Sequence, residues 1–245
     1  MIVNKLENGY EIIYHSAHGL LAGKIASHIS RDLYGSSRFE TIMAIASHDD
    51  LQPKLENGDH LSDQGIPKNF TENSQALHEI IKRCQQLILE ATRRSPYVAI
   101  LVSHHMDFLY TPLANSSKKM AKFLDEQVTY RKHLTDHHGL SQISIDKDYN
   151  ILLFCDRLSL ILCQDQVPHM QRQIEINQTI NNERYFISEK EDQTLTVSPW
   201  VFDTAQFEIN VPSFIIEGSS FESIAQFRTA LDNAKINFKA WKFSE

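Results

Sequence analysis

The residues of this sequence best suited to chemistry are a histidine and two aspartates in succession, His48-Asp49-Asp50. An imidazole nitrogen and a carboxylate oxygen on adjacent residues can bind one divalent ion of hard or borderline character. A His-Asp pair is common by chance, so its meaning depends on the rest of the chain. Further candidate ligands stand before and after it: His15, His18, His104, His105 and Asp156.

Asp156 is the most informative of these residues, because it lies in the middle of an apolar helix predicted over residues 149–164. An unpaired carboxylate is costly to bury. Asp156 therefore needs a metal ion, Arg157 or another base beside it, and a structural salt bridge is the alternative to a metal site. His48 and Asp49 also have a structural interpretation, in which they end a helix and begin a turn.

The paired histidines leave a choice open. Adjacent residues on a helix point about 100° apart, so His104 and His105 cannot occupy one position on a helix face. One of the two enters a site while the other packs or forms a hydrogen bond. His15 and His18 are three residues apart at the start of a predicted helix, so they can share a face, and the residues alone do not decide between them.

The elements that position these residues are predicted from apolar periodicity. Two apolar runs around Asn8-Gly9 predict a hairpin over residues 1–14. Helices are expected over residues 16–29, 37–47, 74–94, 96–109, 116–138 and 149–164. Small residues in the first helix, Gly23 among them, let another helix approach closely. Residues 50–73 contain two Gly and two Pro with little periodicity, which predicts a long loop of the kind that is often functional.

After Pro168 the pattern changes to short strands. Strands are expected near residues 174–176, 185–187, 195–197, 207–211 and 236–243, with a short helix over residues 221–234. Trp200 is expected to anchor this sheet, as Trp usually packs. The predicted fold is mainly α, and α+β as a whole, in one domain over residues 1–245. It has a helical core over residues 15–166 and a small antiparallel sheet, formed by residues 1–14 and 168–245, packed on it as a β-rich appendage.

The composition excludes several classes of function. Of 245 residues, 42% are hydrophobic and 22% charged, as is typical of a soluble globular protein. The net charge of −7 disfavours general binding to nucleic acid or to anionic membranes. No apolar run reaches the roughly 18 residues of a spanning helix, and the N-terminus lacks the order of a signal peptide. Three cysteines in apolar segments predict buried thiols and a cytoplasmic location.

The order of the candidate ligands resembles the HD-domain superfamily of metal-dependent phosphohydrolases, whose signature H…HD…D lies on an all-helical core. By this resemblance a divalent metal would bind to His18 (with His15 as competitor), His48, Asp49 and Asp156. His105, with His104 as the alternative, would bind a second metal or the phosphate.

A closer resemblance is to a family of uncharacterised bacterial proteins of about this length. The match spans most of the chain, favours His18 over His15 and His105 over His104, and brings no known activity. The family has Gly-Trp after its His-Asp-Asp motif, whereas Leu51-Gln52 follow here, a departure that concerns the wall of the pocket and hence the ligand. The matching motifs are His15-Ser-Ala-His18, His48-Asp-Asp50, Gly65-Ile-Pro67, Phe70, Ser103-His-His105, Asp156-Arg-Leu-Ser-Leu-Ile-Leu-Cys163 and Pro199-Trp200.

The HD resemblance implies hydrolysis of a small phosphate ester or nucleotide, with Mn, Mg, Ni, Zn or Fe as the divalent metal. Asp50 would orient or deprotonate the attacking water, and His105 would ligate a second metal or stabilise the transferring phosphoryl group. Lys68, Arg157 and His104 are candidates for binding the substrate. Two alternatives stay open: an HD-type di-iron oxygenase, and a non-catalytic module that binds a metal or a nucleotide. The sequence does not predict an oligomeric state.

Overall fold

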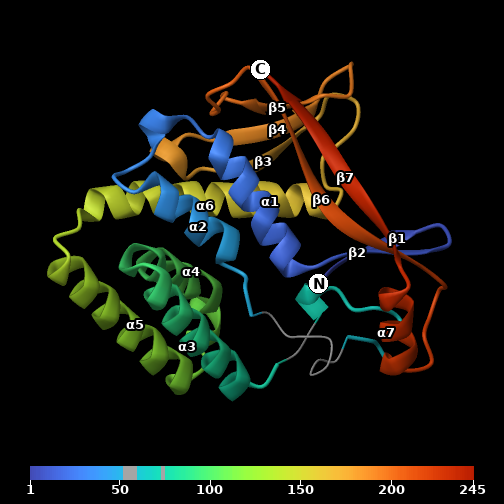
Figure 1. Ribbon diagram of the computed structural model, residues 1–245, viewed down its shortest axis with the longest axis horizontal. Helices are drawn as coiled ribbons and strands as arrows, with labels where there is room; N and C mark the ends of the chain where they lie inside the picture. Colours follow the sequence, from blue (N-terminus) through green and yellow to red (C-terminus); the bar gives the residue numbers. More distant parts are fainter. Residues whose placement is uncertain (52–59, 73–74) are drawn as a thin grey trace.

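The structure is a computed structural model that describes residues 1–51, 60–72 and 75–245. The first six helices of the chain form one layer and a curled sheet of seven strands forms the other, while the last helix stands apart from this layer and packs on the sheet (Figure 1). The fold is therefore α+β, and the expectation of a mainly α protein is wrong. Part of the predicted 50–73 loop, residues 52–59 and 73, lies outside the described residues.

Seven α-helices are formed by the described residues, and each predicted helix is present. They are α1 (His15–His28), α2 (Arg38–Ser47), α3 (Leu77–Arg94), α4 (Pro96–Ala114), α5 (Lys118–His137), α6 (Gln142–Cys163) and α7 (Ile224–Asp232). Two are longer than predicted. Helix α4 continues through Pro112 into its last turn. Helix α6 begins two turns early, at the cap Ser141, because its polar first half hides the apolar periodicity.

All predicted strands are present and join one seven-stranded sheet, which is mixed rather than antiparallel. Its strands are β1 (Ile2–Leu6), β2 (Gly9–Ile13), β3 (Gln173–Asn177), β4 (Tyr185–Glu189), β5 (Leu195–Ser198), β6 (Gln206–Glu217) and β7 (Lys235–Ser244). The order across the sheet is β1-β2-β6-β7-β5-β4-β3. The last strand enters between β6 and β5, where Leu195 and Phe243 pair in parallel. This insertion joins the N-terminal hairpin and the β3-β4-β5 strands into one sheet.

The helical core surrounds α4 and α6, which are apolar on nearly all sides as predicted. Residues 97–103 of α4 are all buried. Helix α6 contacts α1, α2 and α4, and β3 of the sheet layer. None of the residues 151–163 of α6 is exposed, so Asp156 faces other groups of the protein and not open solvent.

Helices α1 and α2 approach closely at two glycines. A Cβ atom added to Gly23 would lie 2.8 Å from Cβ of Ala46, and one added to Gly19 would lie 2.8 Å from the carbonyl oxygen of Ala46. The predicted close approach at Gly23 is thus confirmed. Because His18 precedes Gly19 and His48 ends α2, this contact brings the two histidines together.

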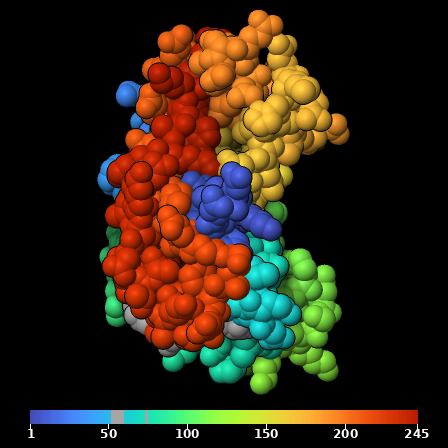
Figure 2. Space-filling model, turned by 90° about the vertical axis from the view of Figure 1, so that its right-hand side faces the viewer, coloured from blue at the N-terminus to red at the C-terminus, as the bar shows by residue number. Residues whose placement is uncertain are grey.

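The described part of the loop, residues 60–72, contacts the start of the chain and the segment before α7. Figure 2 shows it (cyan) beside the N-terminal hairpin (blue) and the orange-red segment that includes α7. The amide of Phe70 donates to the carbonyl of Met1 at 3.0 Å, and the amide of Phe221 donates to the carbonyl of Gly65 at 2.8 Å. Gly65 has φ +74°, and an added Cβ would lie 2.1 Å from the oxygen of Phe221, so only glycine fits this position.

Trp200 packs against Phe202 and Phe207, with ring centroids 5.0 and 6.2 Å away, which confirms its expected role in the sheet. All three cysteines are buried and free, as predicted. None of the helices formed by the described residues combines the length and apolar character needed to span a membrane.

Candidate metal centre

Four elements bring the candidate ligands together. Helix α1 carries His18, the turn after α2 carries His48 and Asp49, α4 carries His105 and α6 carries Asp156. His18, His48 and His105 are almost fully buried, and Asp156 is 9% exposed. Residues up to 138 positions apart in the chain thus meet at one point of the helical layer.

The donor atoms converge on Asp156. Its Oδ1 lies 3.1 Å from Nε2 of His18 and 3.2 Å from Nε2 of His48, and its Oδ2 lies 3.8 Å from Nε2 of His105. Oδ2 of Asp49 lies 3.7 and 3.9 Å from the same nitrogens of His18 and His48. Two triads can therefore hold a metal ion, His18/His48/Asp49 and His48/His105/Asp156.

Neighbouring acceptors fix the tautomers of two histidines. Nδ1 of His48 lies 2.6 Å from the carbonyl of Ile45, which can only accept, so this nitrogen carries a proton. The hydroxyl of Ser159 donates to the carbonyl of Asp156 at 2.8 Å. Its oxygen therefore accepts from Nδ1 of His18 at 3.0 Å. In both neutral rings the lone pair is on Nε2, the nitrogen that faces Asp156.

This arrangement fits a metal ion. Two Nε2 lone pairs and a carboxylate oxygen repel one another at about 3 Å unless a proton or a cation lies between them. Histidines whose Nδ1 donates to a fixed acceptor are typical of metal sites, since the hydrogen bond orients the ring. His105 differs in this respect, because its Nε2 faces Asp156 while its buried Nδ1 has no hydrogen-bond partner among the described residues. The mixed nitrogen and oxygen donors suit Zn, Mn, Fe or Ni better than a purely oxygen site would.

The pKa values agree with a site that attracts positive charge. Burial lowers the pKa of His48, but the carboxylates of Asp49 and Asp156 raise it by a larger amount. The net result is a pKa of about 9. Burial raises the pKa of Asp156, yet hydrogen bonds from His18 and His48 bring it far below its ordinary value. The pKa of His105 falls to about 4, chiefly through burial. The carboxylates are thus ionised and the site favours positive charge, which a proton on His48 supplies in the metal-free protein and a bound metal ion can supply in its place.

A cavity of about 280 Å³ opens onto this cluster. His15, Asp49, His105 and Asp156 form its polar floor. Phe70, Ile80, Leu109 and Leu160 are apolar parts of the wall. The cavity joins a charged floor to a partly apolar wall, which is the usual composition of a small-molecule site.

The competing histidines separate clearly. His18 belongs to a triad, whereas His15 donates from Nδ1 to Asp49 at 3.0 Å and packs on Phe70. His105 faces Asp156, whereas His104 packs on Tyr149 with ring centroids 5.1 Å apart. The structure brings together His18, His48, Asp49, His105 and Asp156, with His15 adjoining them.

Three other predicted residues lie apart from the cluster. Asp50 lies 3.6 Å from a guanidinium nitrogen of Arg94. The backbone amide of Lys68 donates to the carbonyl of His60 at 2.8 Å. Arg157 is half-buried on α6. All three lie outside the set of described residues that line the cavity, so their roles in catalysis or substrate binding stay predictions.

Sequence reasoning missed four polar residues of the cavity: His60, Gln75, Arg83 and Tyr110. Three of them stand on or beside predicted helices, where their types alone indicate solvent-facing side chains. One signal was present for Arg83, which follows Ile80 by three residues on the face that carries the buried stripe of α3. His60 lies in the loop, where no periodicity exists to be used.

Leu51 adopts a backbone conformation suited to glycine. Its φ is +64°, in the left-handed region that costs an L-residue with a side chain roughly 1 kcal/mol. Glycine, which the resemblance to the uncharacterised family leads us to expect after His-Asp-Asp, would adopt this conformation without strain. The side chain of Leu51 packs against the hydrophobic core, and this burial offsets the strain. Gln52 lies outside the described residues.

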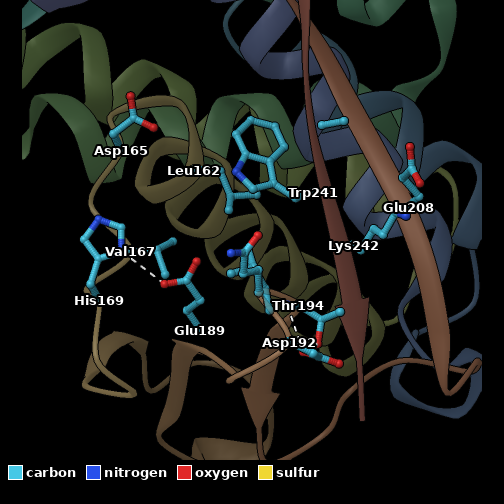
Figure 3. A pocket seen from close by; sticks show the side chains of 13 residues that line it. Leu162, Asp165, Val167, His169, Glu189, Asp192, Thr194, Glu208, Trp241 and Lys242 are labelled. Atoms are coloured by element: carbon cyan, nitrogen blue, oxygen red, sulfur yellow. Dashed lines mark hydrogen bonds and ion pairs between the residues drawn. The ribbon is translucent and has the colours of Figure 1, made fainter.

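A larger cavity, of about 630 Å³, lies between β5, β7 and the segment after α6 (Figure 3). Three of its four carboxylates have partners: Glu189 with His169 at 3.1 Å, Asp192 with Thr194, and Asp165 with Lys239 at 2.7 Å. No metal-holding group among the described residues lines it. Carboxylates outnumber basic groups, which disfavours an anionic ligand. Its ionisable lining consists of Asp165, Glu189, Asp192, Glu208, His169 and Lys242.

The fold and the cluster define an α+β protein with a buried His/Asp site that can hold a metal ion. A family model described as "Protein of unknown function (DUF3891)" matches residues 1–218, and the chain belongs to this family. The expected membership of an uncharacterised family is thereby confirmed. Neither the curated proteins nor the solved structures provided a match.

Proposed function

We propose that this protein is a divalent-metal-dependent phosphohydrolase that acts on a small phosphate ester or nucleotide. One observation carries the proposal: His18 and His48, each with Nδ1 committed to a neighbour, present Nε2 to the same oxygen of Asp156 beside a cavity. The order of these residues along the chain resembles that of the HD-domain phosphohydrolases. The family itself supplies no activity.

The residues in and around the cluster would have different roles in this reaction. His18, His48, Asp156 and Asp49 would hold the ion. When bound, such an ion polarises a phosphoryl oxygen and lowers the pKa of water, which supplies a nucleophile near neutral pH. His15 donates to Asp49 and so fixes the orientation of that carboxylate at the cavity floor. Apolar side chains of the wall, such as Leu160, limit the access of bulk water to the reacting group.

The test is elemental analysis of protein purified without chelator and then supplied with Mn, Mg, Ni, Zn or Fe. We expect about one or two equivalents of metal per chain in the wild type. His48→Ala and Asp156→Asn should abolish the binding, whereas His104→Ala, whose ring lies on Tyr149 outside both triads, should retain it. Circular dichroism shows whether each variant is folded. The loaded protein is then assayed against phosphate monoesters and nucleotides.

The outcomes separate the candidate functions. A folded wild type that binds none of these metals overturns the proposal. Iron combined with oxygen consumption identifies the oxygenase instead, and bound metal without turnover identifies a binding module. Hydrolysis that disappears in Asp156→Asn and survives in His104→Ala supports the phosphohydrolase.

A further inference from the structure

Arg83 lines the same cavity as the His/Asp cluster. It lies on α3, half-buried, between Ile80, which also lines the cavity, and Leu87, which is buried in the core. Its side chain therefore leaves the edge of the buried stripe of the helix and reaches the cavity wall instead of open solvent. Asp49, His105 and Asp156 are on the same lining.

Neutral groups hold the guanidinium of Arg83. One terminal nitrogen donates to Oε1 of Gln75, and the other donates to the hydroxyl of Tyr110 at 2.8 Å. Burial raises the pKa of Tyr110 to about 12, although Arg83 acts in the opposite direction. The phenol is thus uncharged at neutral pH and does not balance the guanidinium.

No carboxylate among the described residues lies within ion-pair distance of Arg83. Two other arginines of the helical layer differ from Arg83 in this respect. Arg94, on the same helix, is paired with Asp50, and Arg131 is paired with Asp107. A half-buried charge without a counter-ion is unfavourable in the free protein. It is useful where an anionic ligand supplies the missing charge.

The geometry also suits an oxyanion. A guanidinium has five N–H donors in a rigid plane. Gln75 and Tyr110 each accept one hydrogen bond from it, so the other N–H donors are left for a ligand. Because both terminal nitrogens are tethered, the plane is held in one orientation before a ligand arrives, which reduces the entropic cost of binding. Arginine in a fixed plane can bind phosphoryl oxygens through two hydrogen bonds.

We propose that Arg83 is the residue that binds the phosphoryl group of the substrate. This inference rests on the proposed phosphohydrolase function, since it names the group that recognises the phosphate to be cleaved. The carboxylates of Asp49 and Asp156, which line the same cavity, repel a phosphate there until a cation neutralises them. Binding of phosphate is therefore expected to be stronger in the metal-loaded protein than in the metal-free protein.

The experiment is calorimetric titration of inorganic phosphate into metal-loaded wild type, Arg83→Gln, Arg83→Lys and Arg94→Gln. We expect Arg83→Gln to raise the dissociation constant at least tenfold. Arg83→Lys, which keeps the charge and loses the planar pair of donors, should lie in between. Arg94→Gln, on the same helix but outside the cavity lining, should remain within twofold of the wild type. Sodium chloride at matched ionic strength controls for general screening.

Equal phosphate affinity in Arg83→Gln and wild type, or absence of phosphate binding in the wild type, overturns the role of Arg83. Metal content and hydrolysis are measured on the same samples, so the two proposals fail separately. If Arg83→Gln hydrolyses the substrate with an unchanged KM, the proposed role of Arg83 is disproved and the phosphohydrolase function is not. A wild type that binds no metal disproves the phosphohydrolase function. If this metal-free protein binds phosphate, and Arg83→Gln abolishes that binding, an anion site at Arg83 is still supported.

Discussion

Ser159 lies one helical turn after Asp156 on α6, and its hydroxyl contacts two groups of the candidate centre. It donates to the carbonyl of Asp156 and accepts from Nδ1 of His18. The sequence motif that contains it, Asp156-Arg-Leu-Ser159, thus supplies a candidate ligand and the residue that orients another candidate ligand. Residues that are three positions apart on a helix lie on the same face. The spacing therefore places the Ser159 hydroxyl on the side of α6 that carries Asp156.

We predict that Ser159→Ala weakens metal binding about 10-fold, as removal of the group that orients a metal-binding histidine typically does. Without the hydroxyl, the ring of His18 can carry its proton on either nitrogen, and part of the population presents an N–H to the ion. Metal affinity by calorimetry is the measurement. Ser144→Ala, on the polar first part of α6, is the control, and equal affinity in Ser159→Ala and Ser144→Ala would disprove the role of Ser159.

At the scale of elements, the centre depends on how closely α1 and α2 pack. Alanine normally stabilises a helix relative to glycine by about 1 kcal/mol. At Gly23 the added methyl would meet Cβ of Ala46 at 2.8 Å, and overpacking of this kind costs about 1–3 kcal/mol. The helices must separate to relieve it, and His18 and His48 separate with them.

Gly23→Ala is therefore expected to lower the free energy of unfolding by about 1 kcal/mol and to weaken metal binding. The second change Ala46→Gly removes the methyl group on the facing helix and should restore the metal affinity in the double variant. Thermal unfolding and metal calorimetry of both single variants and the double variant measure this. A Gly23→Ala protein that is more stable than the wild type would show that the two helices are not in tight contact.

The elements also show what the sequence could predict. Asn8-Gly9 and the apolar periods gave the hairpin and every helix, because those signals are local. The strands were also predicted from local patterns, but the mixed order of the sheet was missed, since the insertion of β7 between β6 and β5 pairs strands that are far apart in sequence. Arg83 was missed for a similar reason: whether a polar side chain on a helix meets solvent or a cavity wall depends on which segments cover it.

At the scale of the molecule, Lys239 connects three distant parts of the chain. Its Nζ lies 2.8 Å from Glu11 on β2 and 2.7 Å from Asp165, just after α6. Glu11 also accepts from Asn4 on β1, whose amide donates to the carbonyl of Cys163. The side chains of Glu11 and Lys239 are 7% and 18% exposed, so this ion pair is only weakly screened by solvent. It fastens the last strand to the first hairpin and to the helical layer.

Protonation of Glu11 should therefore be visible in the stability of the whole protein. Burial raises the pKa of Glu11, but the hydrogen bonds from Lys239 and Asn4 together lower it by a larger amount. The pKa of Glu11 therefore lies below the ordinary value of 4.5. The folded state then binds fewer protons than the unfolded state around this pH. The stabilisation is fully present above pH 4.5 and is lost as the pH falls through the pKa of the folded state.

We predict that Glu11→Gln is less stable than the wild type by about 1.5 kcal/mol at pH 7, the order expected for hydrogen bonds to a charged group. This difference should shrink as the pH falls below 4.5, because the protonated Glu11 of the wild type then resembles Gln.

Lys239→Met should cost more, about 3 kcal/mol, because it leaves a buried carboxylate without its cation. The double variant Glu11→Gln/Lys239→Met should recover part of that loss, since no unpaired charge remains at Glu11. Denaturant unfolding at pH 3 and pH 7, with the exposed Lys242→Met as control, measures these effects. A difference between wild type and Glu11→Gln that is equal at the two pH values would mean that the ion pair does not connect the two layers energetically.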